Sequence, residues 1–294
     1  MLYLFRLEKA KNVTPGPQNN EERKRNDTNI KNSIFAAMSK IYTTEITSDQ
    51  IASDNPLHQR LLKPYFVSHQ WIKGDLLEVG CGQGRGIDWL LPSIASYSAI
   101  DKIESAVAEL RKKYSSGNFV SGHLPPLPYP DSSFDSLVSF QVIEHIENDA
   151  LFLKEIFRVL RPGGVALITT PNRIQSLSRN PWHIREYTSP ELTRLAETIF
   201  PKVEMKGVVG NEKVMMYHES NRKSVNKIMR WDIFDLQHKL PAYILRTPYD
   251  LLNRMNRNKL QTSSDELVRD ITVEDYVITD EGASGLDLFL IVRK

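Results

Sequence analysis

Cysteine is nearly absent from this chain of 294 residues, in which Cys81 is the only one. A single cysteine excludes an intramolecular disulfide and a cysteine-based zinc cluster. Long hydrophobic runs are missing from the start of the chain, because the apolar stretch 1–5 is interrupted by Arg6. That stretch is too short for the core of a signal peptide or for a membrane span. We therefore expect a cytoplasmic protein.

The chain also has little net charge, +2 overall, which argues against a general role in binding polyanions. The charge is uneven, however, since residues 222–260 hold nine lysines and arginines against three aspartates. This basic segment predicts peripheral contact with an anionic membrane surface. Aromatic residues are not interleaved with the charges as a stacking surface would require, so we expect no nucleic-acid partner.

Residues 1–33 are mostly polar and charged and include the sequence Pro15-Gly16-Pro17. A segment with so little apolar area cannot offset the entropy cost of ordering itself, so we expect a flexible leader. The sequence leaves open whether Met1 or Met38 is the native start.

From about residue 57, short apolar strands alternate with amphipathic helices. Such alternation predicts an α/β fold with a doubly wound, mainly parallel, seven-stranded Rossmann-like sheet. The expected elements are strands at 76–79, 97–100, 118–120, 136–140, 165–169 and 203–209, and helices at 86–94, 104–114, 149–160 and from Ser189. The chain closes with strands at 271–278 and 286–292, which we expect to pair as a C-terminal antiparallel hairpin.

The sheet domain is expected to comprise residues 34–210 and 271–294, interrupted by a helical insertion at 211–270. Apolar residues of the insertion recur at helical spacing: Val225, Ile228, Met229, Ile233, Leu236 and Leu240, then Tyr243, Ile244, Leu251, Leu252 and Met255. We expect a helical cap that packs on the sheet domain and exposes a basic face to solvent. The alternative is that this cap covers an acceptor pocket and attracts an anionic substrate or membrane.

A glycine-rich loop follows the first strand, in the sequence Leu-Leu-Glu-Val-Gly-Cys-Gly-Gln-Gly-Arg-Gly at 76–86. Glycines at this point of an open α/β sheet let the backbone approach a ligand closely. The dinucleotide pattern Gly-x-Gly-x-x-Gly fails from each starting glycine, because Arg85, Ile87 or Trp89 stands at its third position. No Gly-Lys-Ser/Thr triplet follows, and the carboxylate of Glu78 would repel a pyrophosphate.

The loop resembles the first motif of class I S-adenosylmethionine (SAM)-dependent methyltransferases, and further motifs follow in order. Residues 97–101 resemble the family's second strand with its terminal acid, 127–135 and 140–145 its third and fourth motifs, and 160–164 the turn before its fifth strand. The resemblance covers about residues 55–210 and the final strand. It is closest to the methyltransferase type 11, quinone-biosynthesis-like branch, which includes sugar, lipid and natural-product enzymes.

This resemblance implies SAM as the cofactor, S-adenosyl-L-homocysteine as the product, and no metal. The loop would hold the methionine part, Asp101 the ribose hydroxyls, and Gln141 would lie near the methionine part. Relatives often carry an acid where this chain has His123, so the adenine contact falls to that imidazole or to the backbone N–H of Leu124. The implied cofactor residues are Glu78, Gly80, Cys81, Gly82, Gly84, Asp101, Lys102, His123, Leu124 and Gln141.

Two histidines are candidate general bases for the transfer. His145 is expected to open the helix after the fourth strand, where it could instead serve only as a helix-start residue bonded to backbone. His183 lies in the segment 180–187, which in this family roofs the acceptor pocket. The alternative for that segment is a rigid turn in which Arg185 pairs with Glu186. Cys81 is expected to pack under the glycine loop and not to act as a nucleophile.

These observations predict a methyltransferase acting on a small-molecule, sugar or lipid-like acceptor, with oxygen as the expected methyl acceptor. Nitrogen or carbon methylation on the same fold remains an alternative. The Asn/Asp-Pro-Pro-aromatic signature of amino-group methylation is absent after the fourth strand, where Gln141-Val142-Ile143 stands. A SAM sensor or scaffold without turnover is the non-enzymatic alternative.

Overall fold

The computed structural model describes residues 51–232 and 235–294. These residues belong to one compact unit, Thr44–Lys294. The leader predicted at 1–33, the choice between Met1 and Met38, and Ile233 of the predicted insertion lie outside the described residues.

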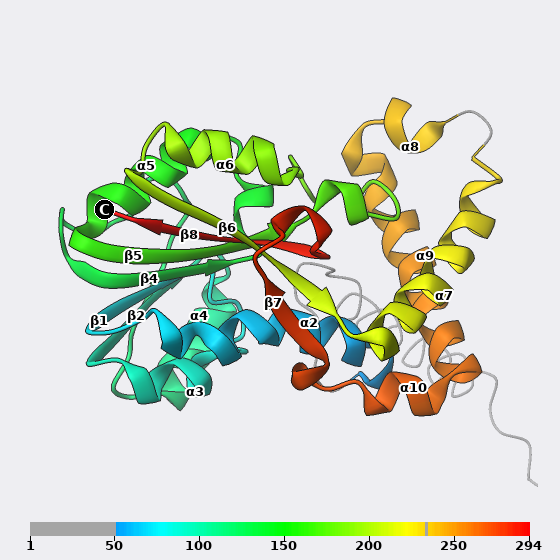
Figure 1. The fold of residues 1–294 in the computed structure, drawn as a ribbon, viewed down its shortest axis with the longest axis horizontal. Coiled ribbons are helices and arrows are strands. Elements are labelled where there is room, and N and C mark those ends of the chain that lie inside the picture. Colours follow the sequence, from blue (N-terminus) through cyan, green and yellow to red (C-terminus); the bar gives the residue numbers. More distant parts are fainter. Residues whose placement is uncertain (1–50, 233–234) are drawn as a thin grey trace, which may run out of the picture. The chain divides into compact units, whose positions relative to one another are not determined.

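Eight strands form one sheet in the order β3-β2-β1-β4-β5-β8-β6-β7 (Figure 1). The strands are β1 (Asp75–Val79), β2 (Ser96–Asp101), β3 (Asn118–Ser121), β4 (Phe134–Phe140), β5 (Leu160–Pro171), β6 (Lys202–Gly210), β7 (Tyr276–Thr279) and β8 (Asp287–Arg293). Strands β1 to β5 pair in parallel, whereas β8 runs antiparallel to both β5 and β6, and β7 runs antiparallel to β6. The predicted mainly parallel, doubly wound sheet is confirmed.

Two details of the predicted sheet were wrong. The sheet has eight strands instead of seven, and its last two strands do not form a hairpin with each other. Strand β6 lies between them, so that Gly207 faces Thr279 on one side and Leu288 on the other. The reason is burial: the apolar β8 is buried from Asp287 to Val292 and takes an interior position, whereas the short β7 exposes Val277 at the sheet edge.

Helices cover both faces of this sheet (Figure 1). One layer holds α2 (Asn55–Val67), α3 (Ile87–Leu90) and α4 (Glu104–Lys113), and the other holds α5 (Asp149–Val159) and α6 (Ser189–Glu197). Alternating side chains of β1 show why, because Leu76 packs into the core that contains Tyr65, whereas Leu77 packs into the core that contains Phe152.

Local sequence explains where several helices begin and end. Helix α3 is shorter than the predicted 86–94, since Pro92 lies in a 3-10 turn, Leu91–Ser93, that follows it. Helix α6 is capped by Thr188, one residue before the expected Ser189, through reciprocal hydrogen bonds with Glu191. His145 does not open a helix as predicted. It ends a 3-10 turn, Ile143–His145, and α5 begins four residues later behind the Asn148 cap.

The insertion predicted at 211–270 is helical, with α7 (Glu212–Met229), α8 (Leu236–Lys239), α9 (Ala242–Ser263) and α10 (Asp265–Asp270). The expectation that its apolar faces pack inward is wrong for α9. Tyr243 is 72% exposed, Leu251 43% and Met255 59%. Among the described residues, none of the helices is long and apolar enough to cross a membrane.

Candidate active site

The glycine loop after β1 has the backbone shape that its sequence predicts. Gly80, Gly82 and Gly84 have φ values of +83°, +52° and +76°, in the left-handed region that favours glycine. A Cβ at Gly80 would also lie 2.3 Å from the Val142 side chain. Any other residue at Gly80 would therefore strain the backbone and collide with the segment after β4.

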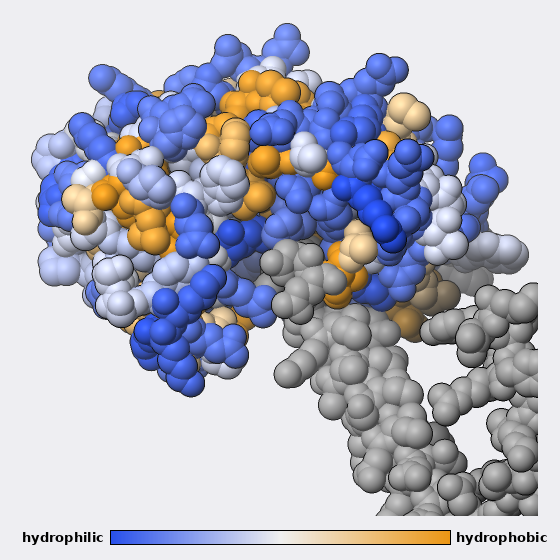
Figure 2. Space-filling view, turned by 90° about the horizontal axis from the view of Figure 1, so that it is seen from below, coloured by the Kyte–Doolittle hydropathy of each residue, from blue (hydrophilic) through white to orange (hydrophobic). Residues whose placement is uncertain are grey.

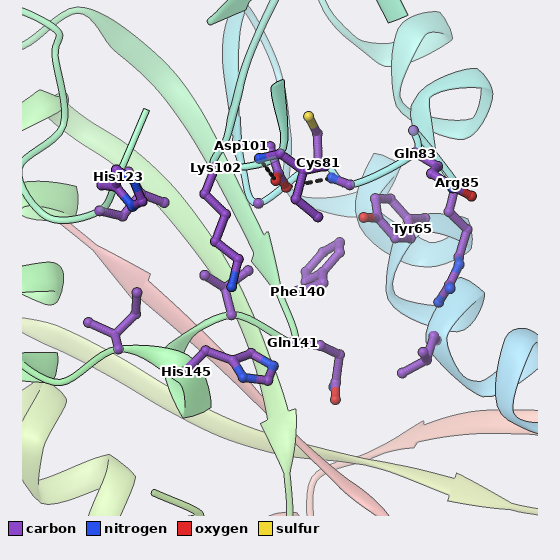
Figure 3. A pocket seen from close by; sticks show the side chains of 18 of the residues that line it. Tyr65, Cys81, Gln83, Arg85, Asp101, Lys102, His123, Phe140, Gln141 and His145 are labelled. Atoms are coloured by element: carbon purple, nitrogen blue, oxygen red, sulfur yellow. Dashed lines mark hydrogen bonds between the residues drawn. The ribbon is translucent and has the colours of Figure 1, made fainter. Parts of the chain in front are cut away.

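Asp101, at the end of β2, ties the glycine loop to the next turn. One carboxylate oxygen accepts a hydrogen bond from the Gly82 N–H at 2.8 Å, and the other accepts one from the Ile103 N–H at 2.9 Å (Figure 3). Each carboxylate oxygen has a second lone pair, so Asp101 can accept further hydrogen bonds from ligand hydroxyls while it holds the loop.

A cleft of about 980 Å³ lies over this loop, and most of the predicted cofactor residues line it. They are Gly80, Cys81, Gly82, Gly84, Asp101, Lys102, His123, Leu124 and Gln141, together with the candidate base His145. In Figure 3, Lys102, Gln141 and His145 come from separate elements and point into the cleft. Burial raises the pKa of the Cys81 thiol, with Glu78 adding to the effect, so the thiol stays protonated.

The structure places Glu78 behind the wall of the cleft, away from the position expected for direct contact with methionine. It is buried, and its two oxygens accept hydrogen bonds from the hydroxyls of Tyr65, at 2.7 Å, and Tyr97. Burial raises the pKa of Glu78, although both hydrogen bonds oppose the shift. Glu78 is absent from the lining of the cleft, so it acts on the site through Tyr65, which does line it.

Sequence analysis missed the aromatic wall formed by Tyr65 and Phe140, whose rings meet edge to face with centroids 4.7 Å apart. Tyr65 also explains why residue 86 is glycine, because a Cβ there would lie 1.8 Å from its ring. The glycine at position 86 was a signal that another group packs closely against the backbone there. Nothing in the sequence identifies which aromatic residue this is.

Gln141 marks the point where the cleft meets a second cavity. It follows β4 with φ of +60°, a left-handed conformation that is uncommon outside glycine, and its N–H donates to the Thr169 carbonyl at 2.9 Å. Gln141 and His145 line both the cleft and the second cavity, which has a volume of about 250 Å³. The second cavity also takes residues from α2, from the segment 171–186 and from helices α7 and α9.

Hydrogen bonds fix the tautomer of His145. Its Nδ1 lies 3.0 Å from the carbonyl oxygen of Trp182. A carbonyl only accepts hydrogen bonds, so Nδ1 carries the proton and the lone pair of the neutral ring is on Nε2. This arrangement suits a residue that accepts a proton at the junction of the two cavities.

His183 lines the second cavity, but both of its ring nitrogens bond within its own loop. Nδ1 lies 2.6 Å from Glu186, and Nε2 lies 2.8 Å from the side-chain nitrogen of Asn180. The expected pair of Arg185 with Glu186 is wrong, because Arg185 pairs with Asp149 at 2.8 Å. Burial alone would raise the pKa of Glu186, but hydrogen bonds from His183 and Ser176 hold it below its usual value. His183 therefore orders the loop.

Glu144 joins the two histidines in a group that sequence spacing did not reveal. Atoms of Glu144, His145 and His183 that could bind a metal lie within 4.8 Å of one another. As the side chains stand, each is engaged with protein: Thr170 donates to Glu144 at 3.0 Å, and the histidines bond as described above. Burial raises the pKa of Glu144 to about 7, and His183 offsets only part of that effect.

Comparisons with known proteins agree with this geometry. Residues 77–168 match a family model described as a methyltransferase domain. A probable S-adenosylmethionine-dependent methyltransferase of Mycolicibacterium smegmatis is 41% identical over 168 residues, which cover 55% of this chain and 65% of that protein. A fatty-acid O-methyltransferase of the same species is 35% identical over 98 residues, which cover 32% of this chain and 36% of that protein. The match thus spans less than two thirds of either relative.

A solved structure supports the fold. It is a SAM-dependent methyltransferase of Thermotoga maritima, described as a possible histamine N-methyltransferase, which superimposes with a TM-score of 0.52 at 15% identity. The alignment covers 81% of this chain and 92% of that one. At such low identity, the similarity shows a shared architecture only.

Proposed function

We propose that this chain is a class I SAM-dependent methyltransferase that transfers the methyl group of SAM to an oxygen of a small-molecule or lipid-like acceptor, a proposal supported by its similarity to methyltransferases. The observation that carries the proposal is that Gln141 and His145 line both the cleft over the glycine loop and the second cavity. One cavity can hold the methyl donor and the other the acceptor, so the two would meet beside these residues.

SAM supplies a methyl group on a sulfonium, which is already a competent electrophile. The chain has to align the acceptor and exclude water. We assign the methionine part to the loop 80–84, the ribose to Asp101, and the adenine to the region of His123 and Leu124. These residues fit the group, because the positive-φ glycines leave the cleft open along the loop and Asp101 keeps acceptor capacity.

A hydroxyl acceptor gains from a base as its proton leaves. We assign this role to Nε2 of His145, whose Nδ1 proton is held by the Trp182 carbonyl. His183 is assigned a positioning role, because its bond to Glu186 orders the loop that carries Trp182. No metal is required by this scheme.

The relatives named for lipid substrates are consistent with a lipid-like acceptor, and the exposed face of α9 suggests how such an acceptor would be reached. Tyr243, Leu251 and Met255 of α9 are exposed. The face of the molecule seen from below also carries apolar patches between hydrophilic residues (Figure 2). The exposed basic residues of the segment 222–260 are Arg222, Lys223, Lys227, Arg230, Lys239, Arg246 and Lys259. An apolar stripe with a basic surround suits peripheral contact between residues 222–260 and an anionic membrane.

The decisive experiment is calorimetric titration with SAM and with S-adenosylhomocysteine, followed by incubation of a cell lipid extract with labelled SAM. We expect both nucleosides to bind, and Asp101→Ala to weaken binding by about 1–3 kcal/mol through lost hydrogen bonds. Unchanged affinity in Asp101→Ala would contradict the ribose assignment. Binding without any labelled product from the wild-type chain would favour the sensor alternative, and label recovered on nitrogen or carbon would favour the other acceptor chemistries.

A further inference from the structure

We propose that the acceptor enters the second cavity through a neutral, hydroxyl-rich head group of sugar-ring size, and not through a carboxylate or a phosphate. This inference rests on the proposed function, since it takes the second cavity as the acceptor site. It is carried by the charge balance, polarity and size of that cavity.

The charged residues of the cavity wall are already compensated by protein partners. Arg60 Nε lies 3.1 Å from the buried carboxylate of Asp287. Arg257 lies 3.0 Å from the buried carboxylate of Asp54. Both arginines among the described lining residues therefore have a carboxylate partner, and an anionic acceptor would have to compete with it.

The remaining ionisable groups of the wall do not favour an anion either. No lysine is found among the described residues that line the cavity. Burial lowers the pKa of His218, and Arg60 and Arg222 lower it further, so its ring is neutral at pH 7. The carboxylate of Glu186 lines the same space and would repel a carboxylate or phosphate, whereas Glu144, with a pKa of about 7, is only partly ionised at pH 7.

Uncharged polar side chains form a large part of the rest of the wall, beside apolar residues such as Leu57, Val214 and Leu286. The side-chain amides of Gln175, Asn221 and Asn253 line the cavity. An amide donates and accepts hydrogen bonds, as a sugar hydroxyl does, so the two match in either direction. Trp182 and Tyr249 add aromatic residues to the lining, although the Arg246 guanidinium lies over the Trp182 ring, 4.4 Å from its centroid. An acyl chain here would bury these polar groups without partners.

The size of the cavity points the same way. Its volume of about 250 Å³ lies just below the range of small-molecule sites, which is roughly 300–1,000 Å³. A single head group fits such a space, whereas a long chain would have to remain outside it. A glycolipid would therefore place its sugar in the cavity and its chain elsewhere.

The test uses three probes that share an octyl chain and differ in the head group: octyl β-D-glucoside, octanoate and octyl phosphate. Each is titrated calorimetrically, below its critical micelle concentration, into the full chain saturated with S-adenosylhomocysteine. We expect the glucoside to bind at least about tenfold more tightly than either anion. Equal or tighter binding of octanoate or octyl phosphate would overturn the inference.

Variants locate the binding site. Asn253→Leu, which replaces a lining amide by an apolar side chain of similar size, should abolish the preference for the glucoside. The matched control Asn226→Leu changes an exposed asparagine of α7 outside the lining and should preserve the preference. Gln175→Leu, in the loop, gives an independent measurement if Asn253→Leu lowers the melting temperature. A preference that survives both lining variants would overturn the assignment to this cavity.

The two proposals fail in different ways. If S-adenosylhomocysteine does not bind, the proposed function fails before any octyl probe is added. If it binds and the glucoside shows no preference, only the head-group inference fails.

Discussion

His145 illustrates how a backbone contact can define a chemical role for a side chain. Its sequence neighbours do not determine which ring nitrogen carries the proton. The Trp182 carbonyl, 37 positions away in the chain, does so from 3.0 Å. Because that carbonyl belongs to the loop ordered by His183 and Glu186, the two histidines have different and dependent roles.

Replacement of His145 tests the proposed difference in role between His145 and His183. We expect His145→Ala to lower kcat by about 100-fold or more, as loss of a general base does, while the affinity for S-adenosylhomocysteine changes little. The measurement is steady-state turnover of labelled SAM with a lipid extract, alongside calorimetry. His183→Ala should mainly raise the KM for the acceptor. If His145→Ala retains kcat within about threefold, the base assignment is wrong.

Glu144 makes a prediction about stability and pH. Burial raises its native pKa to about 7, whereas in the unfolded chain it titrates near its ordinary value of about 4.3. Between these values the native state binds more protons, so stability falls as pH rises from about 4.3 to 7 and is constant with respect to this group above that. The shift corresponds to roughly 3.5–4 kcal/mol.

The effect of Glu144 can be isolated with Glu144→Gln, which cannot titrate. We expect the free energy of unfolding of the wild type, relative to Glu144→Gln, to decrease by about 2–3 kcal/mol between pH 5 and pH 8. Urea denaturation at the two pH values measures it. A parallel pH dependence in both proteins would show that Glu144 is not the titrating group.

At the residue scale, the sequence predicted the glycine loop because its motif lies on neighbouring residues, whereas the cofactor contacts of these residues stay a prediction. Gly80, Gly82, Gly84 and Asp101 all lie where the pattern requires. The sequence did not reveal that Glu78 is covered by Tyr65 and Tyr97, because these two residues come from α2 and β2. The contact of these tyrosines with Glu78 depends on packing between separate elements, which the spacing of residues within one motif does not predict.

At the scale of elements, α9 reverses the expected pattern of an amphipathic helix. Its inner face carries Arg254 and Arg257, which pair with the buried Asp54 at 2.8 and 3.0 Å. Its outer face carries Leu251 and Met255. The hydrophobic period of the sequence identified the helix but assigned its apolar face to the wrong side, because Asp54 lies about 200 positions earlier in the chain.

Removal of Asp54 should therefore loosen α9. Asp54→Ala leaves two partly buried guanidinium groups without their carboxylate, and we expect a loss of about 3 kcal/mol in the free energy of unfolding. Hydrogen exchange should show faster exchange in α9 than in β4. Glu219→Ala, which breaks the exposed pair with Arg222, is the control and should change little. Equal exchange rates for α9 in wild type and Asp54→Ala would contradict this anchoring.

Strand order shows a second limit of sequence patterns. The five parallel strands were predicted, because β1, β2 and β4 are each followed by a helix that returns the chain across the sheet, although β3 leads to β4 without a helix. The final pairing was not, since β7 and β8 are neighbours in sequence but β6 separates them in the sheet. Strands that are adjacent in sequence usually pair as a hairpin. Here β8 lies between β5 and β6 instead, because that position buries its apolar side chains.

At the scale of the whole molecule, Leu251 and Met255 of α9 and several basic residues of the insertion are exposed, and a partner that binds them would decide the cellular setting of the protein. Burial of Leu251 and Met255 in a membrane interface would contribute roughly 1.5–3 kcal/mol each. Each nearby lysine or arginine adds about 1 kcal/mol near anionic lipid, and salt screens that part. A second copy of the chain is the competing partner, and it would not depend on lipid charge.

Flotation with vesicles separates these partners. We expect the full chain to float with phosphatidylglycerol vesicles at low salt, to float less at 0.5 M NaCl, and to remain at the bottom with phosphatidylcholine alone. The double substitution Leu251→Asp, Met255→Asp should reduce binding at least tenfold because it places two charges in the apolar stripe. S-adenosylhomocysteine affinity reports whether this variant stays folded. The surface would instead bind a second copy of the chain if the wild type does not float with any vesicle and elutes as a dimer, while the double variant elutes as a monomer.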